Sequence, residues 1–125
     1  MTSKTPAIAK AGNARRSWRI AVLGTGSIGS RHLDVLNSSG EFDTIAIPLR
    51  VNRASELARQ GQNTASNLAE AVEKGATLCV VATDTGRHLI DGIEALDQGL
   101  DILVEKPMAP STLEASRLVH HAKKT

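Results

Sequence analysis

Aromatic residues are scarce in this chain of 125 residues, which contains one tryptophan, one phenylalanine and no tyrosine. The stacking platforms on which nucleic-acid bases pack are therefore missing, and we expect no nucleic-acid partner. Long apolar runs are missing as well: residues 20–23 and 78–82, among the longest, fall far short of the roughly 20 residues that cross a bilayer as a helix. We therefore expect no membrane-spanning segment.

The chain contains only one cysteine, and its first 19 residues contain no acidic residue. The single cysteine, Cys79, excludes an intrachain disulfide and a cysteine-based metal site, and it favours a reducing, cytoplasmic location. The first 19 residues contain five basic residues and no acid, so the remaining 10 basic and 13 acidic residues give the rest of the chain a charge of −3. We expect a basic disordered tail over residues 1–17, or alternatively a transit peptide, followed by one folded domain over residues 18–125.

Apolar segments bounded by glycines alternate with segments of helical period, which is typical of a parallel sheet covered by helices. We expect strands over residues 18–23, 44–49, 63–65, 78–82 and 102–104. We expect helices over residues 27–38, 53–60, 67–74, 86–98 and from 111 to near the C-terminus. Asn67 and Ser111 are the predicted N-caps of two of these helices, and the helix over 86–98 should present Leu89, Ile93 and Leu96 on one face. The sequence therefore predicts a doubly wound α/β domain.

The first strand and the first helix are joined by a glycine-rich turn, Gly24-Thr25-Gly26-Ser27-Ile28-Gly29. This spacing between a strand and a helix is typical of dinucleotide sites in Rossmann folds. Gly24 would form the tight turn, Gly26 would let the backbone approach a pyrophosphate, and Gly29 would let helix and strand pack closely. A mononucleotide P-loop is excluded, because Ser30-Arg31 stands where that loop needs Lys and then Ser or Thr. The alternative interpretation is a glycine-rich turn without a ligand.

The end of the second strand bears on the choice of cofactor. An NAD-specific site normally has Asp or Glu there, but this chain has Pro48-Leu49-Arg50-Val51-Asn52-Arg53. Asp43 belongs to the opposite end of that strand. A guanidinium binds phosphate with two parallel hydrogen bonds, so Arg50 or Arg53 is a candidate for the 2′-phosphate of NADP. The alternative is that both are solvated charges at a helix start. The sequence thus favours NADP over NAD.

Two further loops follow later strands, Ala82-Thr83-Asp84-Thr85-Gly86-Arg87-His88 and Glu105-Lys106-Pro107. Because the carboxyl ends of parallel strands meet at one edge, these loops and the glycine turn should converge on one crevice. His32 follows the glycine turn and is expected to pack or cap near it. These two loops, the glycine turn and His32 together form a pattern that extends over residues 18–125. The chain resembles the glucose-fructose oxidoreductase, inositol dehydrogenase and MocA (Gfo/Idh/MocA) family of NAD(P)-dependent enzymes.

The resemblance implies roles for the matching positions. Ala82, Thr83 and Asp84 would border the nicotinamide half of the cofactor, and His88 would lie close to it. Glu105 would lie near the nicotinamide ribose, and Lys106 would orient a sugar or polyol hydroxyl and assist proton transfer, with Pro107 after a cis peptide bond. An ammonium at that place would stabilise the negative charge that develops on the oxygen. Without the other motifs, a Lys-Pro pair is also an ordinary strand terminator.

Members of the family normally continue into a second α/β domain with a catalytic histidine, and nothing follows Thr125 here. We therefore expect the NAD(P)-binding domain of a sugar or polyol oxidoreductase, as a truncated form or fragment with little turnover alone. The alternative is a non-catalytic dinucleotide-binding module that acts as a regulator or through partners. An uncovered sheet edge should favour self-association or a complementing C-terminal domain.

Overall fold

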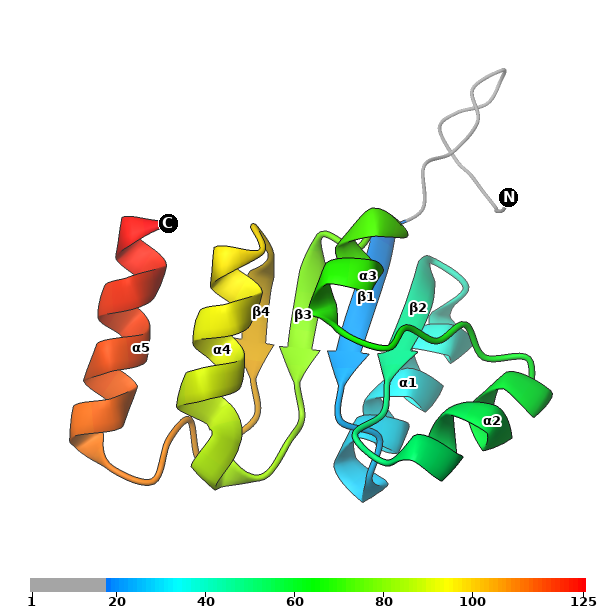
Figure 1. The fold of residues 1–125 in the computed structure, drawn as a ribbon, viewed down its shortest axis with the longest axis horizontal. Helices are drawn as coiled ribbons and strands as arrows, with labels where there is room; N and C mark the ends of the chain where they lie inside the picture. The colour runs from blue at the N-terminus through cyan, green and yellow to red at the C-terminus, as the bar shows by residue number, and fades with distance from the viewer. Residues whose placement is uncertain (1–17) are drawn as a thin grey trace, which may run out of the picture.

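The computed structural model of the protein describes residues 18–125, which form one parallel sheet with helices on both faces (Figure 1). The strands in this range are β1 (Trp18–Leu23), β2 (Phe42–Ile47), β3 (Leu78–Val81) and β4 (Asp101–Val104). They pair in the order β2-β1-β3-β4, and every pair is parallel. The predicted doubly wound fold is confirmed, whereas the tail predicted over residues 1–17 lies outside the described residues.

Different helices cover the two faces of the sheet. They are α1 (Ser27–Ser39), α2 (Val51–Arg59), α3 (Leu68–Glu73), α4 (His88–Asp97) and α5 (Thr112–Lys124), with a short 3-10 turn η1 (Thr85–Arg87). Leu33 of α1 and Leu57 of α2 pack against one face, and Leu68 of α3 and Ala95 of α4 pack against the other. In Figure 1, α3 and α4 accordingly lie in front of the strands and α1 lies behind them. Because strand side chains alternate between faces, each short apolar strand contributes to both layers.

All four strands point the same way, so the loops that follow them lie along one edge, the lower edge in Figure 1. From β1 the chain moves to β2 on one side, and it then returns to β3 and β4 on the other side of β1. Ligands of open α/β sheets bind where the strand order reverses in this way. The glycine turn after β1 and the loop after β3 lie at that position.

Two predicted strands require correction. Residues 63–65 do not form a strand and make only an isolated bridge between Thr64 and Ala46. The amide of Ala46 donates to Asn63 and the amide of Ala65 donates to Ala46, both at 2.9 Å, before the chain turns into the start of α3. The second strand covers residues 42–47 rather than 44–49, because Pro48 has no amide hydrogen for the ladder.

The buried face of α4 also differs from the predicted one. Leu96 is buried as predicted, but Leu89 and Ile93 are only half-buried, and the other buried residues of this helix are His88, Asp91, Gly92 and Ala95. A Cβ at Gly92 would come within 2.7 Å of Leu118 in α5, so the helices pack closely there. The helix starts at His88 rather than at residue 86, after the turn η1. The predicted N-caps are confirmed: Asn67 accepts from the Glu70 amide at 2.8 Å and Ser111 from the Glu114 amide at 3.2 Å.

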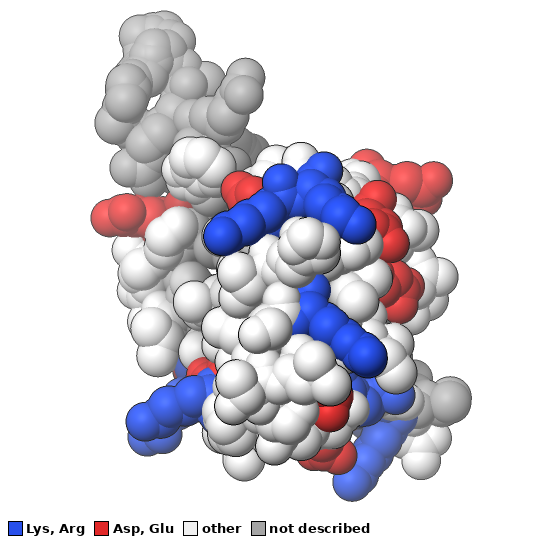
Figure 2. Space-filling view, turned by 90° about the vertical axis from the view of Figure 1, so that its left-hand side faces the viewer, with Lys and Arg blue, Asp and Glu red and all other residues white. Residues whose placement is uncertain are grey.

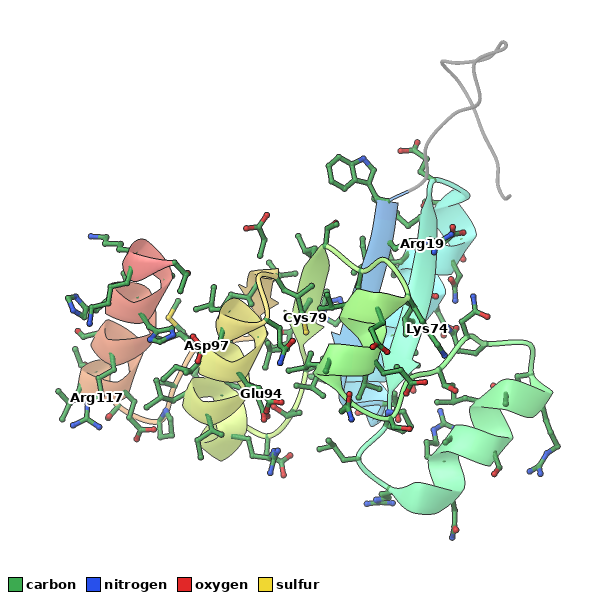
Figure 3. All side chains as sticks on the ribbon, turned by 45° about the horizontal axis from the view of Figure 1, so that its top comes forward. Arg19, Lys74, Cys79, Glu94, Asp97 and Arg117 are labelled. Carbon is green, nitrogen blue, oxygen red and sulfur yellow. The ribbon has the colours of Figure 1, made fainter. Side chains whose placement is uncertain are left out.

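Cys79 lies on β3, at the position labelled in Figure 3, and its side chain is fully buried. Burial raises the pKa of its thiol to about 12. The thiol therefore behaves as a small core residue. The cytoplasmic location inferred from this residue stays a prediction. No helix within residues 18–125 combines the length and the apolar character that a bilayer crossing requires.

Candidate functional site

The glycine turn after β1 uses each glycine for a different reason. Gly24 has a φ of +93°, and a Cβ there would lie 2.8 Å from the carbonyl oxygen of Ala82. A Cβ on Gly29 would collide with the carbonyl group of Gly24, so only glycine lets α1 pack this closely on the turn. Gly26 has extended backbone and no other heavy atom within 4 Å of its Cβ position. The first and third glycines therefore serve the fold, whereas the second leaves open space.

The first turn of α1 faces that open space with free backbone amides. Gly26 caps the helix without a side-chain hydrogen bond, and its carbonyl accepts from the Ser30 amide at 2.8 Å. The amides of the intervening residues have no partner within the helix, as in any first turn. Ser27 and Ile28 are exposed, whereas Thr25 is buried and its carbonyl accepts from the Ser30 hydroxyl at 3.1 Å. The arrangement suits an anion above Gly26.

Basic residues gather where β2 ends. Arg50 is exposed and precedes α2, and Arg53 is half-buried on the first turn of that helix. The Arg53 guanidinium donates to the hydroxyl of Ser30 in α1 at 3.2 Å and to the carboxylate of Glu56 at 2.5 Å. Together with Asn52, Glu56 and Arg59, these arginines line a shallow hollow. Asp43 lies near the other end of β2 and faces Arg19 at 3.8 Å, as the sequence predicted for its position.

The loop after β3 is held by a buried carboxylate. Asp91 of α4 has 2% of its surface exposed. It accepts from the hydroxyl of Thr83 at 2.7 Å and from two nitrogens of Arg87, at 3.0 and 3.1 Å. Ala82 donates its amide to Leu23 at 2.9 Å, which keeps the start of this loop beside the glycine turn. Asp84 is exposed at the start of η1.

The loop after β4 meets α1 through a side-chain pair. His32 of α1 contacts the carboxylate of Glu105 through its Nε2 atom. The hydrogen bond from His32 is the largest cause that holds the pKa of Glu105 below its ordinary value. The Glu105 amide donates to Val81 at 3.1 Å, so this loop starts beside the end of β3. Lys106 is exposed, and the peptide bond between Lys106 and Pro107 is cis.

The sequence of the described part matches one known family throughout. Residues 18–125 match the model of the Gfo/Idh/MocA group, described as an oxidoreductase family with an NAD-binding Rossmann fold. The chain belongs to this family. Inositol 2-dehydrogenase of Corynebacterium glutamicum strain R is 30% identical over 109 residues, which cover 83% of this chain and 32% of that protein. The chain thus spans about a third of the length of the curated relatives it matches.

Solved structures share the fold of this Gfo/Idh/MocA chain. The WlbA dehydrogenase from Bordetella pertussis, in complex with NADH and UDP-GlcNAcA, has a TM-score of 0.77 at 25% identity over 87% of this chain and 35% of its own. A 3-ketoreductase from Actinomadura kijaniata, in complex with NADP, has a TM-score of 0.75 at 24% identity over the same shares. The family match makes residues 18–125 an NAD(P)-binding Rossmann domain, and these structural neighbours include both an NADH and an NADP complex.

The structure of this Gfo/Idh/MocA domain brings most of the predicted site residues to one edge of the sheet. A Cβ on Gly24 would touch both Ala82 and Thr83, and Glu105 lies next to the end of β3, where its amide donates to Val81. Arg50 and Arg53 lie further out, at the end of β2. His88 is buried beneath the loops, with 1% of its surface exposed, rather than open to the crevice. The functional roles of all these residues stay predictions.

Sequence reasoning missed two side-chain connections of this domain. The first joins Arg87, the last residue of η1, to Asp91 in α4, and the spacing of four residues between opposite charges is a signal that could have revealed it. The pair of His32 and Glu105 joins residues 73 positions apart, and no local pattern announces it. Within residues 18–125, no three His, Cys, Asp or Glu side chains gather as metal ligands would.

Proposed function

We propose that this chain supplies the NADP(H)-binding part of an oxidoreductase that interconverts a hydroxyl and a carbonyl on a sugar or polyol. The glycine turn is the observation that supports this most directly, because an open surface and free amides lie together at Gly26. The names of two similar proteins, an inositol dehydrogenase and a dehydrogenase bound to UDP-GlcNAcA, support a polyol or sugar as substrate.

The residues of the turn fit a dinucleotide. Gly24, Thr25 and Gly26 would pass beneath the pyrophosphate, and the amides at the start of α1 would bind it through Ser27, Ile28 and Gly29. No side chain fills the space at Gly26, so the backbone can come within hydrogen-bond distance of a phosphate. The partial positive charge at the helix start favours the same anion.

Arginines at the end of β2 support a preference for NADP(H). Arg50 is free to turn toward a 2′-phosphate, whereas Arg53 is already bonded to Ser30 and Glu56. One charge-assisted hydrogen bond contributes about 1.5 to 3 kcal/mol. NADP(H) should therefore bind about tenfold or more tightly than NAD(H).

Isothermal titration with NADP(H) and NAD(H) tests both parts of the proposal. Arg50→Ala should remove most of the preference, and Arg117→Ala on α5, at the opposite end of the molecule (Figure 3), is the matched control. A full preference in Arg50→Ala would transfer the role to Arg53. The absence of binding by either dinucleotide at millimolar concentration would refute the proposal as a whole.

The loops after β3 and β4 would contact the nicotinamide end of the cofactor and the substrate. Ala82, Thr83 and Asp84 would border the nicotinamide, which when bound supplies the hydride acceptor or donor. Lys106 would hold the substrate oxygen by a hydrogen bond from its ammonium and stabilise the negative charge that develops as the hydroxyl loses its proton. Glu105 would lie near the ribose.

Lys106 is exposed to solvent, which bears on turnover. Holding the reacting carbon in place supplies roughly 7 to 11 kcal/mol of a barrier, and a lysine on an open surface supplies little of that. We therefore expect little turnover from this chain alone. The same exposure supports a second candidate, a non-catalytic dinucleotide-binding module. NADP reduction with a panel of sugars and polyols separates the two: turnover of about 1 per second or more that disappears in Lys106→Ala identifies an enzyme.

The edge strand β4 supports self-association or a complementing domain. It pairs on one side with β3, and Leu103 is 53% exposed. Figure 2 looks at the end of the molecule where α5 lies outermost, and much of the surface there is uncharged. Unpaired strand edges with exposed apolar side chains favour association. Sedimentation velocity of the parent chain and of Leu103→Glu tests this, and an unchanged monomer in both would refute it.

A further inference from the structure

His88, the first residue of α4, lies between two loops of the candidate site. Its Nε2 atom lies 2.8 Å from the carbonyl oxygen of Thr83, in the loop after β3. Its Nδ1 atom lies 3.0 Å from the carbonyl oxygen of Pro107 and 3.1 Å from that of Met108, in the loop after β4. One buried imidazole therefore joins α4 to both loops.

The loop after β4 is bonded at Glu105, through its amide to Val81 and its carboxylate to His32, and beyond Glu105 it depends on this imidazole for its hydrogen bonds. In the range that the structure describes, the backbone of residues 106–110 makes no hydrogen bond to other backbone groups. Pro107 has no amide hydrogen to donate. The carbonyl groups of Pro107 and Met108 meet His88 instead, and a buried ring is stable only with such partners.

The two loops differ in how much they need His88. A carbonyl oxygen only accepts, so a hydrogen bond to Pro107 or Met108 requires a hydrogen on Nδ1, and one to Thr83 requires a hydrogen on Nε2. A neutral imidazole carries only one of the two, and the tie to the loop after β4 uses the one on Nδ1. The loop after β3 has a second anchor, because the hydroxyl of Thr83 donates to Asp91, which Arg87 also binds. For the loop after β4, the contact with Nδ1 is the anchor that follows Lys106.

We propose that His88 is a positioning residue for Lys106. Its Nδ1 atom holds the backbone that follows Lys106 directly, so the flexible lysine side chain starts from a fixed base. The proposal rests on the proposed function for the role of Lys106 in the reaction. The tie between His88 and the loop is a property of the protein without ligand, so it can be tested separately.

Three substitutions in the full 125-residue chain separate the two ring nitrogens. The side-chain nitrogen of asparagine stands as many bonds from Cα as Nδ1, and that of glutamine as many as Nε2. His88→Asn should therefore keep a donor for the Pro107 and Met108 carbonyls, and His88→Gln should keep one for Thr83. His88→Ala removes both. His120→Ala, an exposed position on α5, is the control.

Relaxation of ¹⁵N in the amides of Lys106 and Met108 measures the tie without any ligand. We expect order parameters of about 0.85 in the parent chain, in His88→Asn and in the control, and values below about 0.6 in His88→Gln and His88→Ala. The fluorescence emission of the nicotinamide in bound NADPH should likewise be the same in the parent chain, in His88→Asn and in the control, and should differ in His88→Gln and His88→Ala. The Kd of NADPH should change by less than about threefold, because the glycine turn lies outside the His88 contacts.

Rigid Lys106 and Met108 amides in His88→Ala would overturn the proposal. Equal behaviour of His88→Asn and His88→Gln would overturn it too, because a general packing role does not distinguish the two nitrogens. If the parent chain fails to bind NADPH, the proposed function fails, while the relaxation data still decide whether His88 fixes the backbone at Lys106.

Discussion

Gly26→Ala should weaken dinucleotide binding while leaving the fold intact. Its backbone has φ −71° and ψ −159°, an extended conformation that alanine adopts freely, and its Cβ would meet no atom within 4 Å. Alanine is a poorer N-cap than glycine, which costs about 0.5 to 1 kcal/mol. The loss of chain entropy in the unfolded state offsets about 0.4 to 1 kcal/mol of that. The free energy of unfolding should therefore change by less than about 1 kcal/mol.

The same methyl group stands where the backbone would approach the pyrophosphate. Pushing the phosphate away breaks at least one charge-assisted hydrogen bond to the start of α1, which costs about 1.5 to 3 kcal/mol. The Kd for NADP(H) should rise about tenfold to 150-fold.

Gly29→Ala is the contrasting variant, because its Cβ would collide with the carbonyl group of Gly24. The helix or the turn must shift, and such overpacking costs about 1 to 3 kcal/mol. In a domain of this size that lowers the Tm by about 4 °C or more.

Isothermal titration gives the Kd, and thermal unfolding without ligand gives the stability of each variant. A Gly26→Ala chain that keeps its Tm and binds NADP(H) like the parent would refute the assignment of the pyrophosphate to this turn. A Gly26→Ala chain that unfolds like Gly29→Ala would refute the reasoning that separates the two glycines.

Three further outcomes follow from the described contacts. Cys79, whose pKa is raised to about 12, should resist iodoacetamide at neutral pH in the folded chain and react fully in urea, and fast reaction without urea would contradict its burial. Ionised Glu105 is stabilised by His32, so this contribution is present above the ordinary value of 4.5 and is lost as pH falls through the lowered folded pKa. The stability difference between the parent and Glu105→Gln should therefore shrink in acid, and a constant difference across that range in urea titrations would contradict it. Asp91→Ala leaves the Thr83 hydroxyl without its acceptor and should lower the unfolding free energy by about 1 to 3 kcal/mol in urea titrations, with Glu94→Ala, at an exposed position of the same helix, as the control.

Local chemistry made much of this domain predictable. The strand Trp18–Leu23, the glycine turn and the cap at Asn67 each follow from neighbouring residues, since a buried parallel strand, a positive φ and a capping side chain leave short patterns. The loops after β3 and β4 were placed at one edge for the same reason, because parallel strands share a direction.

Long-range packing made the rest unpredictable. Residues 63–65 lie where the alternation of elements predicts a strand, but they meet β2 only at Ala46 before α3 begins at Leu68. The apolar residues of α4 predict its buried face, but that face also contains His88, whose hydrogen-bond partners come from the loop after β4, and Asp91, whose partners are Thr83 and Arg87. The partner of His32 likewise depends on the complete sheet.

The two parts of the candidate site, the glycine turn and the loops after β3 and β4, are built by different means, and this determines what mutations there can reveal. At the glycine turn the backbone alone forms the surface, so substitutions act through space and should change affinity. In the other part, three side chains, His32, His88 and Asp91, hold loops that have few backbone hydrogen bonds of their own. Substitutions of these residues should leave the affinity for the dinucleotide largely unchanged and alter instead where the loop groups stand, because the groups they hold lie next to the reacting end rather than the phosphates.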